Sequence, residues 1–147
     1  MSTPTKTNEL RSTPLQELHI KAGAKLDPFA GWSMPVDYGS ILNEAKTVRE
    51  SCGIFDVSHM ARFIFRDKDI AKKLDYALGG CITDQSIGTA RYTMLLNHKG
   101  GIIDDLLTYR LSEDEFMLVV NASNRARDWE IITERIANTT CSDVTED

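Results

Sequence analysis

Two apolar segments joined by a glycine-containing turn constrain the fold of this chain more than any other feature. Residues 89–96 read TARYTMLL and residues 101–110 read GIIDDLLTYR, and both are rich in the β-branched, aromatic and aliphatic side chains that favour strands. Residues 97–101, NHKGG, lie between them, and paired glycines supply the positive φ that a hairpin turn needs. The sequence therefore predicts an antiparallel β-hairpin here.

Two adjacent carboxylates interrupt the second strand of this hairpin. Aspartate is depleted in strands, and burying it without a partner is costly. Alternate residues of a strand share a face, so Asp104 lies with Ile102 and Leu106 while Asp105 points the opposite way. We expect at least one of the two acids to lie in a partly apolar site that supplies a hydrogen-bond donor or raises its pKa. The spacing alone favours a structural alternative, in which an Asp at a strand end bonds to loop backbone.

The rest of the chain predicts alternating helices and strands. Helices are expected over residues 41–52, capped by Ser40, over residues 70–78, and from residue 123 or 124 to residue 136. Strands are expected over residues 54–67, with a break near 58–59, and over residues 116–121. Residues 13–40 contain Pro and Gly throughout, which favours an irregular wrapping segment. This order predicts an α+β fold, with an antiparallel or mixed sheet that carries helices on one face.

Length and charge narrow the class of protein. The 147 residues fit one domain, expected over residues 13–147 after a flexible tail at residues 1–12. A formal net charge of -5 argues against general attraction to nucleic acid or anionic membranes. The three cysteines have no metal-ligand spacing, and their odd number argues against a disulfide framework, so we expect no metal site. No apolar run reaches about 18 residues and the start is polar, which favours a cytoplasmic protein.

Three motifs in order carry a family resemblance. GWSMPVDYGS, GIFDVSHM and GGIIDDL closely resemble the amino-terminal part of the aminomethyltransferase, or T-protein, of the glycine cleavage system. The resemblance implies a partial folate-binding domain of a larger three-domain fold. It also implies transfer of a methylene carbon from an aminomethyl group on lipoylated H-protein to tetrahydrofolate, with release of ammonia and formation of methylenetetrahydrofolate.

The resemblance also implies roles for individual residues. Asp104 maps to the catalytic aspartate, and Asp105 is then its structural neighbour. Positions that line the pterin pocket map to Met60, Tyr92, Val119 and Asn121. Such a set suits a flat bicyclic pterin, which binds between apolar and aromatic walls with a few fixed polar groups. The resemblance assigns no role to His59, which we expect to be packed and hydrogen-bonded.

Other functions remain open at the level of sequence. A folate-dependent demethylase relative has a similar amino-terminal pattern, and a non-catalytic folate-binding or assembly factor is a candidate from a different class. The chain is also shorter than the family, so we expect a truncated fragment that is inactive alone and binds tetrahydrofolate weakly. A separate carboxy-terminal half, or self-association through an unprotected sheet edge, would then complete the fragment.

Overall fold

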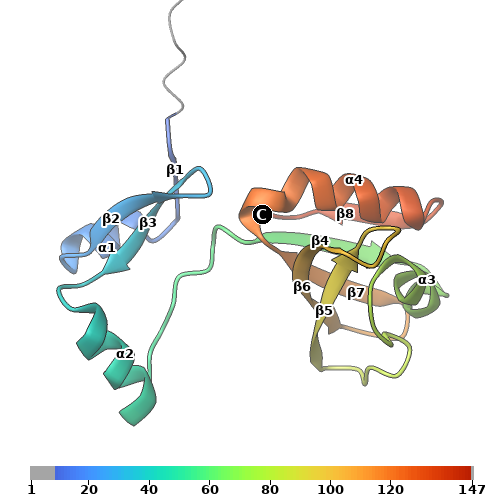
Figure 1. Ribbon diagram of the computed structural model, residues 1–147, viewed down its shortest axis with the longest axis horizontal. Coiled ribbons are helices and arrows are strands. Elements are labelled where there is room, and N and C mark those ends of the chain that lie inside the picture. Colours follow the sequence, from blue (N-terminus) through green and yellow to red (C-terminus); the bar gives the residue numbers. More distant parts are fainter. Residues whose placement is uncertain (1–8, 147) are drawn as a thin grey trace, which may run out of the picture. The chain divides into compact units, whose positions relative to one another are not determined.

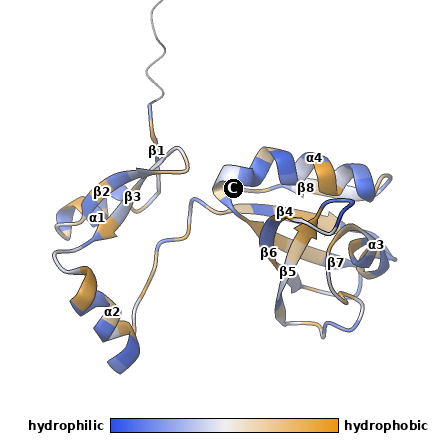
Figure 2. Cartoon of the chain, in the orientation of Figure 1, coloured by the Kyte–Doolittle hydropathy of each residue, from blue (hydrophilic) through white to orange (hydrophobic). Residues whose placement is uncertain are grey.

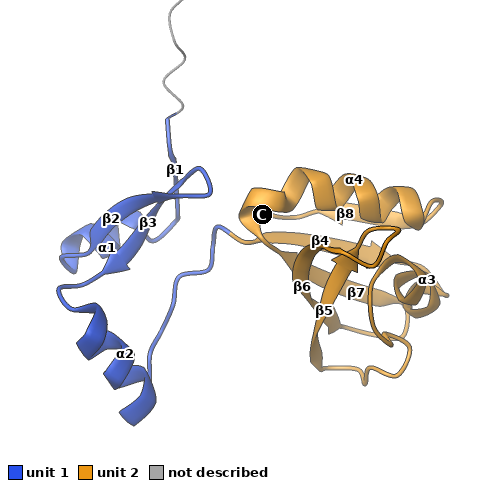
Figure 3. Ribbon diagram, viewed as in Figure 1, with its two compact units in different colours: residues 1–59 blue, residues 60–147 orange. Residues whose placement is uncertain are grey.

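The computed structural model describes residues 9–146, which divide into two compact units (Figure 3). Unit 1 extends to His59 and unit 2 begins at Met60. Unit 1 contains β1 (Arg11–Ser12), α1 (Gln16–Lys21), β2 (Lys25–Phe29), β3 (Trp32–Asp37) and α2 (Ile41–Glu50). Unit 2 contains β4 (Ala61–Arg66), α3 (Ile70–Ala77), β5 (Ala90–Leu96), β6 (Ile102–Arg110), β7 (Glu115–Val120), the 3-10 turn η1 (Ala122–Asn124), α4 (Arg125–Arg135) and β8 (Thr140–Asp143).

Unit 1 is built on a small mixed sheet with the strand order β1-β3-β2 (Figure 1). β1 pairs parallel to β3, and β2 pairs antiparallel to β3 through a turn in which Ala30 and Gly31 have positive φ. Helix α2 begins where the sequence predicts, because the Ser40 hydroxyl accepts a hydrogen bond of 3.3 Å from the Asn43 amide. No residue of α2 is buried, so the apolar side chains of Ile41, Leu42 and Val48 remain exposed.

Unit 2 is a five-stranded antiparallel sheet in the order β5-β6-β7-β4-β8. The predicted hairpin is confirmed as β5 and β6, and Gly100 adopts a φ of 77° in its turn. The register pairs Phe63 with Leu118, and Leu106 with Val120, so that these side chains share one face. Helices α3 and α4 both pack on this face, because their buried side chains belong to the same core. The α+β class is thereby confirmed.

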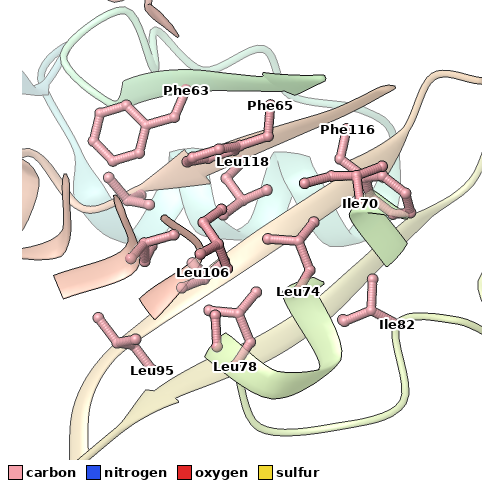
Figure 4. Packing of buried hydrophobic residues seen from close by; sticks show 14 of the residues in the cluster. Phe63, Phe65, Ile70, Leu74, Leu78, Ile82, Leu95, Leu106, Phe116 and Leu118 are labelled. Carbon is pink, nitrogen blue, oxygen red and sulfur yellow. The ribbon is translucent and has the colours of Figure 1, made fainter. Parts of the chain in front are cut away.

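The core of unit 2 fills the space between the sheet and the two helices. Figure 4 shows Phe116 beside Ile70 of α3, and Phe63 and Phe65 from β4 belong to the same cluster as Leu74. Ile132 and Ile136 from the region of α4 complete the cluster. Figure 2 shows the corresponding hydropathy pattern, since the strands are largely hydrophobic whereas α4 is mainly hydrophilic with hydrophobic residues interspersed. Burial of one face is therefore the main source of stability.

Some local expectations are wrong. Residues 13–40 are more regular than predicted, since α1, β2 and β3 all form there. The strand predicted over residues 54–67 exists only as β4, because residues 52–57 adopt neither helix nor strand. The expected tail is partly described: residues 1–8 lie outside the described residues, and Arg11 and Ser12 pair with β3. Residues after α4 form a further strand that was not predicted, β8, which pairs with β4.

We expect Leu74→Ala to lower the free energy of unfolding by about 2–5 kcal/mol, because Leu74 is fully buried and its truncation leaves a cavity. Leu111→Ala is the matched control, since Leu111 belongs to the same unit but is 46% exposed, and surface substitutions change stability by about 0.5 kcal/mol or less. Chemical denaturation followed by circular dichroism measures both. Equal losses in the two variants would contradict the assigned core.

Candidate functional site

Strand β6 places the two adjacent acids on opposite faces of the sheet. Asp104 is 6% exposed and lies on the face covered by the helices, together with Leu106 and Thr108. Asp105 is half-buried and lies on the other, open face. The register places Met94 beside Asp105 and Leu95 beside Asp104. The alternation deduced from sequence is therefore confirmed, and the two carboxylates have different surroundings.

Asp104 belongs to a buried polar cluster at the start of α4. Its Oδ1 accepts hydrogen bonds from Nδ2 of Asn121 at 2.9 Å and from Nδ2 of Asn124 at 2.7 Å. Asp128, on the first turn of α4, is fully buried, and its carboxyl group lies within hydrogen-bonding reach of Asp104. Asp104 Oδ2 and both oxygens of Asp128 are buried and accept no hydrogen bond from a donor group of the described residues. The two acids therefore interact mainly with each other on that side.

The pKa values of the two buried acids move in opposite directions. Burial raises the pKa of Asp128 to about 8, and the hydrogen bond and negative charge of Asp104 add to the rise. Burial acts on Asp104 in the same sense, but hydrogen bonds from Asp128, Asn121 and Asn124 outweigh it and lower the pKa of Asp104. The pair thus holds one proton at neutral pH, and that proton resides on Asp128.

The open face gathers aromatic, apolar and acidic side chains around Asp105. The Tyr92 hydroxyl donates a hydrogen bond of 2.6 Å to Asp105 Oδ2, and this bond is the main cause that raises the pKa of Tyr92. Nδ2 of Asn121 donates to the Asp105 backbone oxygen at 3.0 Å. Cross-strand pairing aligns Tyr92, Leu107 and Val119 in one row. We call Tyr92, Asp105, Leu107, Val119 and Asn121 the open-face cluster.

The structure brings together three of the residues predicted to line the pocket. Tyr92, Val119 and Asn121 all belong to the open-face cluster. Met60 directly precedes β4 and is half-buried, and its neighbour Ala61 pairs with Val120, the residue before Asn121. Asp104 lies on the opposite face from this cluster and reaches it only through the amide of Asn121.

The cluster can bind a flat, partly polar ring. Tyr92 is 60% exposed and Met94 is 36% exposed, so apolar surface on this face is available to a ligand. Asp105 supplies an acceptor, and the Tyr92 hydroxyl and Asn121 amide supply further polar groups at its edge. No group of three or more His, Cys, Asp or Glu side chains that could hold a metal ion occurs within residues 9–146.

His59 is packed as expected, with its ring edge-to-face against Phe29 at 5.6 Å between centroids. Its buried Nδ1, however, has no hydrogen-bond partner in the described part of the chain. Burial lowers the pKa of His59, and the negative charge of Asp56 opposes this effect. The ring therefore serves packing rather than a hydrogen-bonded contact at Nδ1.

Sequence reasoning missed a hydrogen-bonded trio in unit 1. Nε2 of His19 lies 2.8 Å from Asp56 Oδ2, and the Tyr38 hydroxyl lies 2.7 Å from Nδ1 of His19. Burial would raise the pKa of Asp56, but hydrogen bonds from His19 and Ser58 outweigh it and lower this pKa. The trio joins α1, the end of β3 and the segment after α2. Because these segments are far apart in sequence, no local motif predicts the trio.

Unit 1 also contains an apolar groove of about 740 Å³ along α2, β3 and residues 52–55. Its lining includes Val36, Ile41, Val48 and Phe55. None of the residues predicted to bind a ligand lines this groove. The open-face cluster of unit 2, which contains the predicted residues, is therefore the candidate site.

The described part of the chain defines an α+β protein whose main sheet has one helix-covered face and one open face. No helix in that part combines the length and the apolar character needed to cross a membrane. The family model described as the GCVT N-terminal domain matches residues 15–147. The chain belongs to this family, as its motifs indicate.

Known aminomethyltransferases are similar to this chain in sequence and structure. That of Francisella philomiragia subsp. philomiragia is 47% identical over 116 residues, which are 79% of this chain and 32% of the relative. That of Pseudothermotoga lettingae is 46% identical over 126 residues, or 86% and 35% of the two chains. The crystal structure of glycine cleavage system aminomethyltransferase T from Bartonella henselae superposes with a TM-score of 0.79 and 39% identity, over 90% of this chain and 37% of that one. The chain thus spans about a third of the length of these relatives.

We expect the titration of Asp128 to lower the thermal stability of the chain as the pH rises from about 4 to about 8. Because burial raises the pKa of Asp128 from 3.8 to about 8, the folded state holds a proton that the unfolded state has already lost. The stabilising contribution of this proton is therefore complete below the ordinary pKa of 3.8, decreases as the pH rises above it, and is lost once the pH exceeds about 8. Asp128→Asn removes this titration, so its melting temperature should depend less on pH in this window. Identical pH slopes for the two proteins would contradict the assignment.

We also expect His19→Ala to lower the free energy of unfolding by about 1–3 kcal/mol, because it leaves the buried Asp56 carboxylate without its His19 partner. The comparison variant is Lys21→Ala on the same helix, whose exposed side chain has no such role. Urea denaturation measures both variants. A loss no larger than that of Lys21→Ala would mean that the trio does not hold unit 1 together.

Proposed function

We propose that this chain supplies part of a tetrahydrofolate site for aminomethyl transfer in glycine cleavage. The observation that carries the proposal is the gathering of Tyr92, Val119 and Asn121 with Asp105 on one open face. Membership of the GCVT N-terminal domain family and similarity to named aminomethyltransferases support this choice over a demethylase or a non-catalytic folate-binding factor.

In this proposal the apolar row of the cluster lies against the pterin ring. Tyr92, Leu107 and Val119 provide a continuous apolar and aromatic surface across three strands. Asn121 orients a polar edge of the ring, since an amide both donates and accepts hydrogen bonds. Tetrahydrofolate, when bound, supplies the nitrogen atoms that accept the one-carbon unit. The aminomethyl donor would be lipoylated H-protein, and the products ammonia and methylenetetrahydrofolate.

The two acids differ in how well they suit contact with a ligand. Sequence resemblance predicted Asp104 as the catalytic residue, and that assignment stays a prediction. Burial of Asp104 beneath α4, with Oδ1 held by two amides, favours a structural task for it. Asp105 lies on the open face, where its carboxylate accepts hydrogen bonds from the Tyr92 hydroxyl and the Asn121 amide. We therefore propose Asp105 as the carboxylate that meets the ligand and the transferred group.

Binding of a stable reduced folate, 5-formyltetrahydrofolate, to the whole chain tests this function. We expect binding that weakens by about tenfold or more in Asp105→Asn, the effect of losing a hydrogen bond to a charged group, with little change in the unfolding midpoint. Asp104→Asn should instead lower the midpoint, because it replaces a buried carboxylate whose Oδ1 accepts two amide hydrogen bonds. Titration calorimetry and thermal unfolding measure the two effects.

Three outcomes would overturn parts of the proposal. Absence of folate binding by the wild-type chain would remove the folate site. Equal loss of binding with unchanged stability in both variants would restore the sequence prediction for Asp104. Binding of folate without ammonia release from aminomethylated H-protein, when the chain is assayed with the remaining domains of a relative, would favour the non-catalytic alternative.

A further inference from the structure

The buried carboxyl group of Asp128 lies outside the open-face cluster. Asp128 lies on the inner face of α4, one turn before the buried Ile132. Its side chain has no access to the open face, because the residue is fully buried. A buried acid that packs among apolar side chains is costly unless another group pairs with it. Its presence there therefore requires a physical reason.

The contacts around Asp128 lead from α4 to the open face in three steps. Asp128 lies one turn after Asn124 on α4, and its two carboxyl oxygens, like Oδ2 of Asp104, are buried without a hydrogen-bond donor among the described residues. Asp104 Oδ1 accepts from Asn124 at 2.7 Å and from Asn121 at 2.9 Å. Nδ2 of Asn121 also donates to the Asp105 backbone oxygen at 3.0 Å. One amide group thus bonds both to the buried cluster and to the strand position that carries Asp105.

Asn124 connects the start of α4 to Asp104 on β6. It occupies the N-cap position of that helix, yet its side chain makes no capping hydrogen bond to the helix backbone. Its amide instead donates to Asp104. The start of α4 is therefore joined to β6 by a side-chain hydrogen bond, and Asp128 lies one turn further along the same helix.

We propose that Asp128 is a positioning residue for the proposed folate site: by holding Asp104, it fixes Asn121 and the strand end from which Asp105 meets the ligand. This inference rests on the proposed function. The chemistry favours a protonated carboxyl group at this position. Such a group donates one hydrogen bond to Asp104 and adds no second negative charge to the core.

The neighbouring charges are consistent with this arrangement. Asp104 faces Asp128 from β6, and Asn121 and Asn124 approach from the turn before α4. Arg127, which precedes Asp128 on α4, is exposed and donates to the Ile103 backbone oxygen at 2.6 Å. Its positive charge lowers the pKa of Asp128 but does not outweigh burial and Asp104. A proton on Asp128 is thus the group that allows both carboxyls to be buried side by side.

The first experiment is a pH titration of the wild-type chain followed by nuclear magnetic resonance of the Asn side-chain amides. We expect the signals of Asn121 and Asn124 and the backbone signal of Asp105 to move together with a midpoint of about pH 8. In Asp128→Asn, which still offers a donor but does not titrate, this transition should disappear. Glu130→Gln, on the exposed side of α4, should keep it. Loss of the transition in Glu130→Gln, or its persistence in Asp128→Asn, would overturn the proposal.

The second experiment measures binding of 5-formyltetrahydrofolate at pH 7. Asp128→Ala should weaken binding about tenfold, whereas Asp128→Asn should restore most of the wild-type affinity, since its amide can donate to Asp104. Glu130→Ala is the control for truncation of an acid on α4. If Asp128→Ala does not fold, the titration of Asp128→Asn alone decides the matter. Wild-type affinity in a folded Asp128→Ala would overturn the positioning role.

The two proposals fail in different ways. If the wild-type chain binds no folate, the proposed function is wrong, while the amide titration still reports whether Asp128 holds Asn121 and Asp105. If folate binds and the amide signals do not respond to Asp128, the folate site stands and the positioning role is wrong.

Discussion

The strict alternation of side chains along β6 is the constraint on which the rest of unit 2 depends. Leu106 and Thr108 are buried on the face that packs against α3 and α4, while Leu107 and Tyr109 are half-buried on the other face. Because the period of a strand is two, any shift of register by one residue would expose the core face. The same alternation sends Asp104 inward and Asp105 outward. Core formation and the chemistry of the open face are thus set by one register.

Burial of the Asp104 carboxylate is unfavourable for folding. Hydrogen bonds to polar side chains, rather than contact with water, offset this cost. Two asparagine amides and a second, protonated carboxyl group surround Asp104. Such a cluster gives the start of α4 a defined place on the sheet, which apolar packing alone specifies less sharply. The cluster also explains how two neighbouring acids of the same type acquire different properties, since one is fully enclosed and the other faces outward.

The two units use different means of stabilisation. Unit 2 buries a contiguous cluster of three phenylalanines and several aliphatic residues between a sheet and two helices. Unit 1 has a smaller sheet, and hydrogen bonds of His19 with Asp56 and Tyr38 join its distant segments. Helix α2 has a good N-cap but buries none of its residues. Local propensity and capping therefore account for this helix, whereas packing accounts for α3 and α4.

The sequence by itself determined the elements whose signals are local. Periodicity, caps and paired glycines located α2, α3, α4 and the β5–β6 hairpin, and ordered motifs identified the family. Only the tertiary structure decided which face of β6 is covered, because that depends on where the helices pack. It also revealed the buried Asp128 beside Asp104 and the trio around His19, since both sets join residues far apart in the chain. Long-range contacts leave no periodic trace in a single sequence, and the environments of Asp104 and Asp105 follow from those contacts rather than from the motif.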